Sequence, residues 1–140
     1  MNQTRHPAGR LPRWLPALLV MTVIFWLSSR TGDELDGVLP WMQRLLPWMQ
    51  SFDWGHFVAY FALALAFDYA LGARADAPRW KALIVLLCLL YGITDEYHQS
   101  FVAGRMPDPA DLRNDTIGAL AAVLLLAIAP IRRRWRKFAA

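Results

Sequence analysis

The chain has 140 residues and a net charge of +4, and 56% of its residues are hydrophobic. Soluble domains of this length are usually more polar, so the composition indicates a membrane protein. The single cysteine, Cys88, excludes an intramolecular disulfide, and its apolar neighbours favour a packing role over a reactive thiol. The main basic cluster follows an apolar run, which favours contact with lipid headgroups over nucleic acid as a partner.

Four apolar segments follow one another along the chain: Trp14–Ser29, Asp53–Leu71, Trp80–Gln99 and Asp111–Ile131. Crossing a bilayer as a helix takes roughly 17–25 residues, and the last three segments reach that length when their polar ends are included. The first segment is also consistent with a signal peptide, but no small-x-small cleavage motif follows it. We therefore expect an all-α, polytopic membrane protein with four transmembrane helices in a small bundle.

The link Arg30–Phe52 between the first two segments is predicted to hold a short amphipathic helix on the outer side. Its apolar residues recur at helical spacing, namely Leu39, Met42, Leu45, Leu46 and Met49. Pro47 should break or bend this helix, and Trp41 and Trp48 suit the headgroup region of the bilayer. The alternative is a loop that packs over the bundle.

The positions of lysine and arginine predict the orientation. Eleven of the fifteen basic residues lie in three alternating regions: Arg5, Arg10 and Arg13; Arg74, Arg79 and Lys81; and Arg132, Arg133, Arg134, Arg136 and Lys137. We therefore expect both termini in the cytoplasm, with four crossings of the membrane. Residues 1–13 and 132–140 are then basic tails that flank a membrane domain over residues 14–131.

Polar side chains gather at the predicted outer ends of the second, third and fourth segments. They are His56, Tyr60, Asp95, Glu96, His98, Gln99, Arg105, Asp111 and Asp115. Residues four apart share a helical face, so these groups should converge at one level near the outer hydrocarbon boundary. Gly118 and Ala122 continue the stripe of the fourth segment inward, where small residues allow helices to approach closely.

Several chemical roles are open to this cluster. The candidate catalytic residues are His56, Asp95, Glu96 and Asp115. The candidate substrate-binding residues are Tyr60, His98, Gln99, Arg105 and Asp111. The candidate metal ligands are His56, Asp95, Asp111 and Asp115, because a divalent cofactor would relieve the repulsion among the carboxylates. Asp111 alone has a simpler explanation, since it follows Pro109 and could cap the fourth helix.

The ordered motifs resemble those of the VanZ-like family of small bacterial membrane proteins. They are HFxxY at residues 56–60, DExHQxF at 95–101, GR at 104–105 and D-x3-D-x2-G at 111–118, all within residues 53–122. The family commonly has Asp-Lys before the histidine motif, whereas this chain has Asp53 and Trp54, so no lysine role transfers. The resemblance implies an integral membrane protein whose founding member is linked to low-level teicoplanin resistance, and it implies no particular reaction.

Three functions fit these observations. The site could bind or remodel the headgroup of a lipid or of a lipid-linked cell-wall precursor, with Arg105 on a phosphate and the carboxylates on amine or hydroxyl groups. It could instead be a metal-dependent membrane hydrolase or transferase that acts on a lipid-linked substrate. The third interpretation is a structural or partner-binding bundle in which the cluster only holds helices together. A transporter is disfavoured because four short helices leave room for only a small path.

Overall fold

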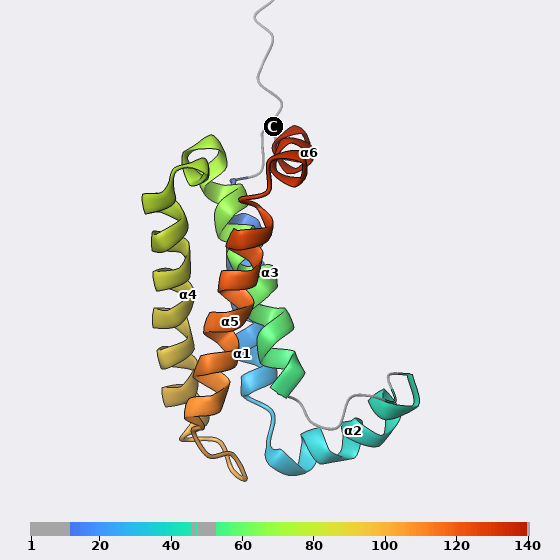
Figure 1. Cartoon of the computed structure of the whole chain (residues 1–140). Coiled ribbons are helices and arrows are strands. Elements are labelled where there is room, and N and C mark those ends of the chain that lie inside the picture. The colour runs from blue at the N-terminus through green and yellow to red at the C-terminus, as the bar shows by residue number, and fades with distance from the viewer. Residues whose placement is uncertain (1–11, 46, 48–52, 140) are drawn as a thin grey trace, which may run out of the picture.

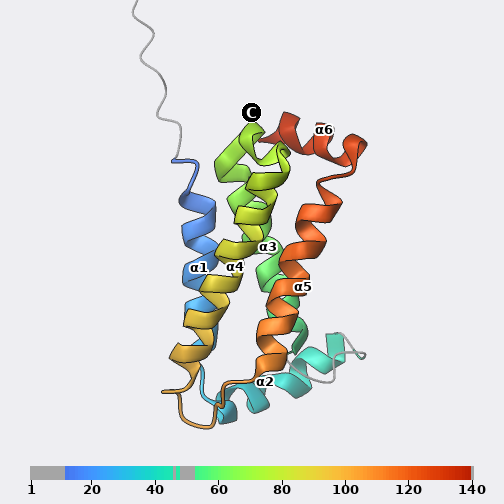
Figure 2. The same cartoon turned by 60° about the vertical axis from the view of Figure 1, so that its left-hand side comes forward.

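The computed structural model describes residues 12–45, 47 and 53–139, and these form an all-α structure (Figure 1). Its helices are α1 (Leu15–Ser28), α2 (Gly32–Leu45), α3 (Asp53–Leu71), α4 (Pro78–Gln99), α5 (Pro109–Leu125) and α6 (Ala129–Phe138), with a short 3-10 helix η1 (Gly72–Asp76) between α3 and α4. Helices α1, α3, α4 and α5 run side by side as a bundle, while α2 and α6 lie at its opposite ends (Figures 1 and 2). The expected all-α class is confirmed.

The outside of the bundle is apolar. Large hydrophobic side chains face outward from α3, α4 and α5, including Val58 (60% exposed), Leu86 (48%) and Leu124 (65%). A soluble monomer rarely exposes so much apolar surface, and a lipid environment removes its cost. Among the described residues, the helical stretch Trp54–Asp76 is long and apolar enough to cross a membrane. The protein is therefore a membrane protein.

By length and hydropathy, the described residues contain fewer candidate membrane spans than the four that the sequence predicts. Two pairs of helices could each form one bent span: α1 with α2, bent by 104°, and α5 with α6, bent by 93°. Together with Trp54–Asp76, these pairs raise the number of candidate spans to three at most. Helix α4 has 22 residues but carries Asp95, Glu96 and His98 near its end, and these residues lower its mean hydropathy. Four crossings therefore stay a prediction.

Proline and aspartate set the two ends of α5. The side chain of Asp108 accepts a hydrogen bond from the backbone N–H of Ala110 at 2.8 Å, and Pro109 occupies the first turn. The expectation that Asp111 caps this helix is wrong, because Asp108 holds that position. At the other end, α5 stops at Leu125 and does not continue to Ile131. Pro130, which has no N–H group and would clash in a helix interior, lies in the first turn of α6 instead.

The core lies mainly between α3 and α5. Tyr60, Leu63 and Ala64 of α3 are fully or almost fully buried, as are Ala119 and Ala122 of α5. Gly118 is essential to this contact, because a Cβ atom added there would overlap the backbone carbonyl oxygen of Phe57 and lie 3.1 Å from the amide nitrogen of Phe61. The predicted close approach of small residues is therefore confirmed.

The predicted amphipathic helix is present as α2, and it begins earlier than its apolar residues suggested. It runs from Gly32 and includes Pro40, and it lies roughly across the end of α1 and extends sideways from the bundle (Figure 2). It therefore does not pack over the bundle as a loop. Leu46, Trp48 and Met49, and the arginines at positions 5 and 10, lie outside the described residues.

The end of the bundle that carries α6 is held by a second group of charges. The buried carboxylate of Asp68 accepts hydrogen bonds from the indole N–H of Trp135 and from the guanidinium of Arg136, which also pairs with Asp76 at 2.8 Å. A side-chain N–H of Arg13 donates to the carbonyl of Ala139 at 2.6 Å, so both described ends of the chain meet here. Their shared placement agrees with an even number of crossings, while their cytoplasmic location stays a prediction.

Candidate functional site

The opposite end of the bundle gathers the polar residues of the sequence motifs. Here the last turn of α1, the first turns of α3, the last turns of α4 and the start of α5 meet, together with the loop between α4 and α5 (Figure 2). Four segments distant in the sequence thus contribute to one region. The polar residues of the motifs therefore lie at one level of the bundle, as predicted.

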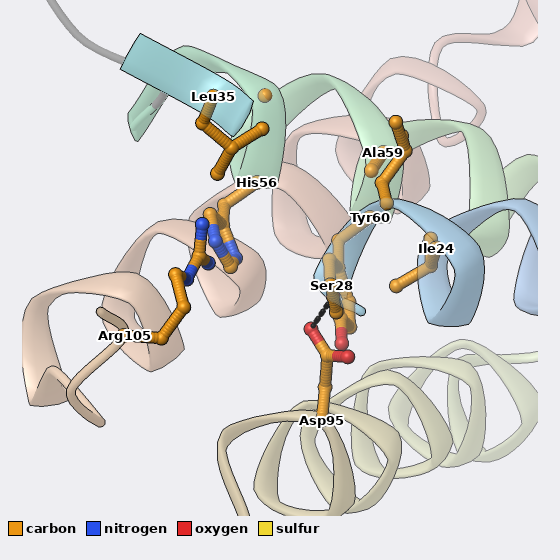
Figure 3. Close-up of a pocket in the computed structure, with 10 residues that line it drawn as sticks. Ile24, Ser28, Leu35, His56, Ala59, Tyr60, Asp95 and Arg105 are labelled. Carbon is orange, nitrogen blue, oxygen red and sulfur yellow. Dashed lines mark hydrogen bonds between the residues drawn. The ribbon is translucent and has the colours of Figure 1, made fainter. Parts of the chain in front are cut away.

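The carboxylate of Asp95 in α4 is tied to α1. Its Oδ2 atom accepts a hydrogen bond from the hydroxyl of Ser28 at 2.9 Å (Figure 3). The same atom accepts a second hydrogen bond from the side-chain amide of Gln99 at 3.2 Å. All three side chains are buried, and Asp95 is only 4% exposed. Ser28 was not predicted from the sequence; its signal was a small polar pair, Ser28 and Ser29, at the end of an apolar run.

Arg105 is placed by the loop after α4. Its guanidinium donates a hydrogen bond to the side-chain oxygen of Gln99, so the amide of Gln99 links Arg105 to Asp95. The loop turns at Gly104, whose φ of +72° is costly for other residues. Close by, the backbone N–H of Gly32 donates to the carbonyl of Ala103 at 3.3 Å. The hydrogen bond to Gln99 therefore orients the side chain of Arg105, and the contact with Gly32 holds the backbone of the loop that carries it.

Glu96 anchors the same loop to the start of α5. One carboxylate oxygen, Oε2, accepts a hydrogen bond from the backbone N–H of Asp108 at 2.8 Å. The other oxygen, Oε1, is buried and has no hydrogen-bond partner among the described residues. A buried carboxylate oxygen without a protein partner is costly, so this atom is suited to bind a cation, a ligand or a water molecule.

His56 of α3 lies between the two aspartates of α5. Its Nδ1 atom is 3.0 Å from Oδ1 of Asp115, and its Nε2 atom is 3.5 Å from Oδ2 of Asp111. Asp115 is fully buried, whereas His56 and Asp111 are partly accessible. The close packing needs Gly92 of α4, because a Cβ atom there would lie 2.8 Å from Oδ2 of Asp115. Gly92 was not predicted from the sequence.

A cavity of about 110 Å³ opens among these residues. Four of the predicted site residues line it, namely His56, Tyr60, Asp95 and Arg105 (Figure 3). The rest of its wall is mostly apolar, with side chains such as Ile24 and Leu27 from α1 and Leu35 from α2. The hydroxyl of Tyr60 is buried without a hydrogen-bond partner among the described residues. The cavity thus combines the guanidinium of Arg105, the carboxylate of Asp95 and a tyrosine hydroxyl that is able to form a further hydrogen bond.

His98 takes a different position from the other predicted site residues. Its Nε2 atom is 3.1 Å from the hydroxyl of Ser29, and its ring lies against Phe25 with centroids 4.4 Å apart. It does not line the cavity. Gln99 also lies outside the lining and acts through its bonds to Asp95 and Arg105. A direct substrate contact by either residue stays a prediction.

Comparison with protein families agrees with this arrangement. The family model described as VanZ/LLP1 matches residues 13–130, which cover nearly the whole described bundle. The chain belongs to the VanZ/LLP1 family. No curated protein and no solved structure matches the chain.

The VanZ/LLP1 match begins at residue 13, well before the HFxxY motif that starts at His56. It therefore includes α1, the helix that supplies Ser28 to the site. The inclusion of α1 fits the structure, in which the polar region is incomplete without that helix.

Proposed function

We propose that this VanZ/LLP1 protein binds or remodels the headgroup of a lipid, or of a lipid-linked cell-wall precursor, at the outer face of the bacterial cytoplasmic membrane. In this proposal α1, α3, α4 and α5 each cross the bilayer, both termini are cytoplasmic, and α2 lies at the outer surface. The cavity that holds both Arg105 and Asp95 is the observation that carries the proposal.

The chemistry of the cavity supports a headgroup that carries both signs of charge. Arg105 supplies planar donors suited to a phosphate. Asp95 offers acceptors to an amine or hydroxyl group, as does the hydroxyl of Tyr60, which still has hydrogen-bonding capacity. The apolar wall from α1 and α2 suits the start of an acyl or polyprenyl chain. A zwitterionic phospholipid and an amine-bearing lipid-linked precursor share this chemistry.

Native mass spectrometry of the full chain released from nanodiscs tests the proposal. We expect the protein to retain phosphatidylethanolamine over phosphatidylglycerol, and Arg105→Ala to lose retention of both by about tenfold, the loss of one charge-assisted contact. Arg30→Ala is the matched control, because Arg30 lies at the same end of the bundle but stacks on Trp26 and pairs with Glu34. Equal retention by Arg105→Ala and the native chain would contradict the proposal.

The same variants separate a binding site from a structural lock. A lock predicts that Arg105→Ala lowers the protein level in cells and the unfolding temperature as much as it lowers lipid retention. A binding site predicts a loss of retention at a normal protein level. Because the founding member of the VanZ-like family is linked to teicoplanin resistance, we extend the proposal to teicoplanin susceptibility, which is measured in cells that express each variant at equal level.

The second candidate function is a metal-dependent hydrolase or transferase that acts on a lipid-linked substrate. One observation favours it: ligand atoms of His56, Glu96 and Asp111 lie within 4.8 Å of one another beside the cavity residues. Release of phosphate or of a headgroup from a lipid-linked substrate in the presence of a divalent metal would support this function. Headgroup binding without turnover, with or without metal, would favour the first.

A further inference from the structure

His56 has a carboxylate on each ring nitrogen. Asp115 lies 3.0 Å from Nδ1 and is fully buried, so it is suited to accept a hydrogen bond from an Nδ1–H group. That tautomer leaves the lone pair of Nε2 directed toward Asp111, whose Oδ2 atom is 3.5 Å away. A positive charge between these two atoms, either a second ring proton or a metal ion, stabilises this arrangement.

Glu96 adds a third electron-rich group. Its ligand oxygen lies within 4.8 Å of the ligand atoms of His56 and Asp111. The side chain is only 9% exposed, and its orientation is fixed because Oε2 accepts the backbone N–H of Asp108. Its Oε1 atom has no hydrogen-bond partner among the described residues. A buried carboxylate oxygen without a partner is unfavourable, and a cation bound to this carboxylate would also be within reach of His56 and Asp111.

We propose that His56, Glu96 and Asp111 bind one divalent transition-metal ion, with Zn²⁺ or Mn²⁺ as the preferred class. One imidazole and two carboxylates suit these ions better than Ca²⁺ or Mg²⁺, which prefer oxygen ligands alone. Three protein ligands also leave a coordination position for water or a substrate oxygen, as catalytic zinc sites do. This metal-site proposal is compatible with either proposed function, because binding of the ion does not depend on the headgroup.

Asp115 is a positioning residue in this site. Histidine ligands commonly donate their second N–H group to a carboxylate, which fixes the ring and its tautomer, and Asp115 is placed to accept that bond from His56. Asp95, which was also predicted as a metal ligand, instead accepts hydrogen bonds from Ser28 and Gln99. The geometry thus selects Glu96, rather than its neighbour Asp95, as the ligand from α4.

Isothermal titration calorimetry of the full chain in nanodiscs, after removal of metal with a chelator, tests the proposal. We expect one Zn²⁺ per chain and binding of Ca²⁺ that is at least about tenfold weaker. Glu96→Gln and Asp111→Asn should each lower Zn²⁺ affinity by at least about tenfold. The matched control is Asp108→Asn, which removes a negative charge at the same end while asparagine keeps the helix cap. Its Zn²⁺ affinity should equal that of the native chain.

Thermal unfolding gives a second readout that does not depend on calorimetry. Zn²⁺ should raise the unfolding temperature of the native chain and of Asp108→Asn by the same amount, and at the same Zn²⁺ concentration should raise that of Glu96→Gln clearly less. Without metal, Glu96→Gln should unfold at or above the native temperature, because one of the repelling charges is gone. Asp111→Asn serves the same test if Glu96→Gln does not yield folded protein.

Nitrogen NMR of the labelled histidine side chains reports the proposed tautomer directly. In the native chain, Zn²⁺ should shift the Nε2 resonance of His56 and leave a proton on Nδ1. Several results would overturn the proposal: no stoichiometric Zn²⁺, native affinity in Glu96→Gln, or loss of affinity in Asp95→Asn but not in Glu96→Gln. The proposal would also be overturned if the ring of His56 kept protons on both nitrogens after Zn²⁺ is added.

Discussion

The contact between α3 and α5 gives a prediction whose magnitude follows from the structure. In Gly118→Ala, the new Cβ atom meets the backbone carbonyl of Phe57, with its carbonyl carbon at 3.1 Å and the amide nitrogen of Phe61 at the same distance. Backbone atoms cannot rotate away as a flexible side chain can. The two helices must therefore separate, and overpacking of this kind costs about 1–3 kcal/mol.

A matched glycine removes the effect of helix propensity from this comparison. Gly55 also lies in a helix, α3, and a Cβ atom added there has no neighbour within 4 Å among the residues that the structure describes. Each substitution gains about 1 kcal/mol from the higher helix propensity of alanine. Gly55→Ala should therefore stabilise the protein, and the difference between the two variants should equal the steric cost of about 1–3 kcal/mol.

Reversible unfolding of both variants, followed by tryptophan fluorescence in the same detergent, measures that difference. We expect Gly118→Ala to be the less stable of the two by at least about 1 kcal/mol. Equal stability, or greater stability of Gly118→Ala, would show that α3 and α5 do not approach as closely as described. The placement of His56 against Asp115 would then lose its support, because the same two helices carry them.

Three further predictions concern other contacts. Gly92→Ala should push the carboxylate of Asp115 and lower Zn²⁺ affinity about tenfold in calorimetry; native affinity would contradict the role of Gly92 as a spacer. Asp68→Asn breaks a buried pair with Arg136 and should cost about 3 kcal/mol, with faster hydrogen exchange in α6; unchanged exchange would show that this pair does not hold α6. Gly104→Ala should cost about 1–2 kcal/mol in thermal unfolding because of its positive φ, and a neutral effect would argue against that turn.

Local patterns were sufficient to predict where the site lies. Residues four apart in α4 and α5 had to share a face, and the apolar segments between them had to form helices. The pairing of His56 with the aspartates of α5 follows once these helices are side by side. Asp108 could also have been identified as the cap, because Pro109 after it is typical of a first helical turn.

The remaining features depend on tertiary structure and could not be predicted from spacing. Ser28 reaches Asp95 only because α1 packs beside α4 at that end. The turn into α6 brings Arg136 back to Asp68, and the sequence indicated only a basic tail there. The choice of Glu96 over Asp95 as a candidate ligand depends on the loop, because the backbone of Asp108 fixes the Glu96 side chain.

The proposed function requires that the end of the bundle with the polar site face the outside of the cell, and labelling of single cysteines tests this most directly. In a chain with Cys88→Ala, we would introduce Met106→Cys in the loop beside the site and, separately, Arg133→Cys in α6 at the opposite end; both positions are exposed. A membrane-impermeant maleimide added to intact spheroplasts should label position 106 and reach position 133 only after the membrane is opened. Labelling of position 133 from outside, with position 106 protected, would contradict an outer-face site.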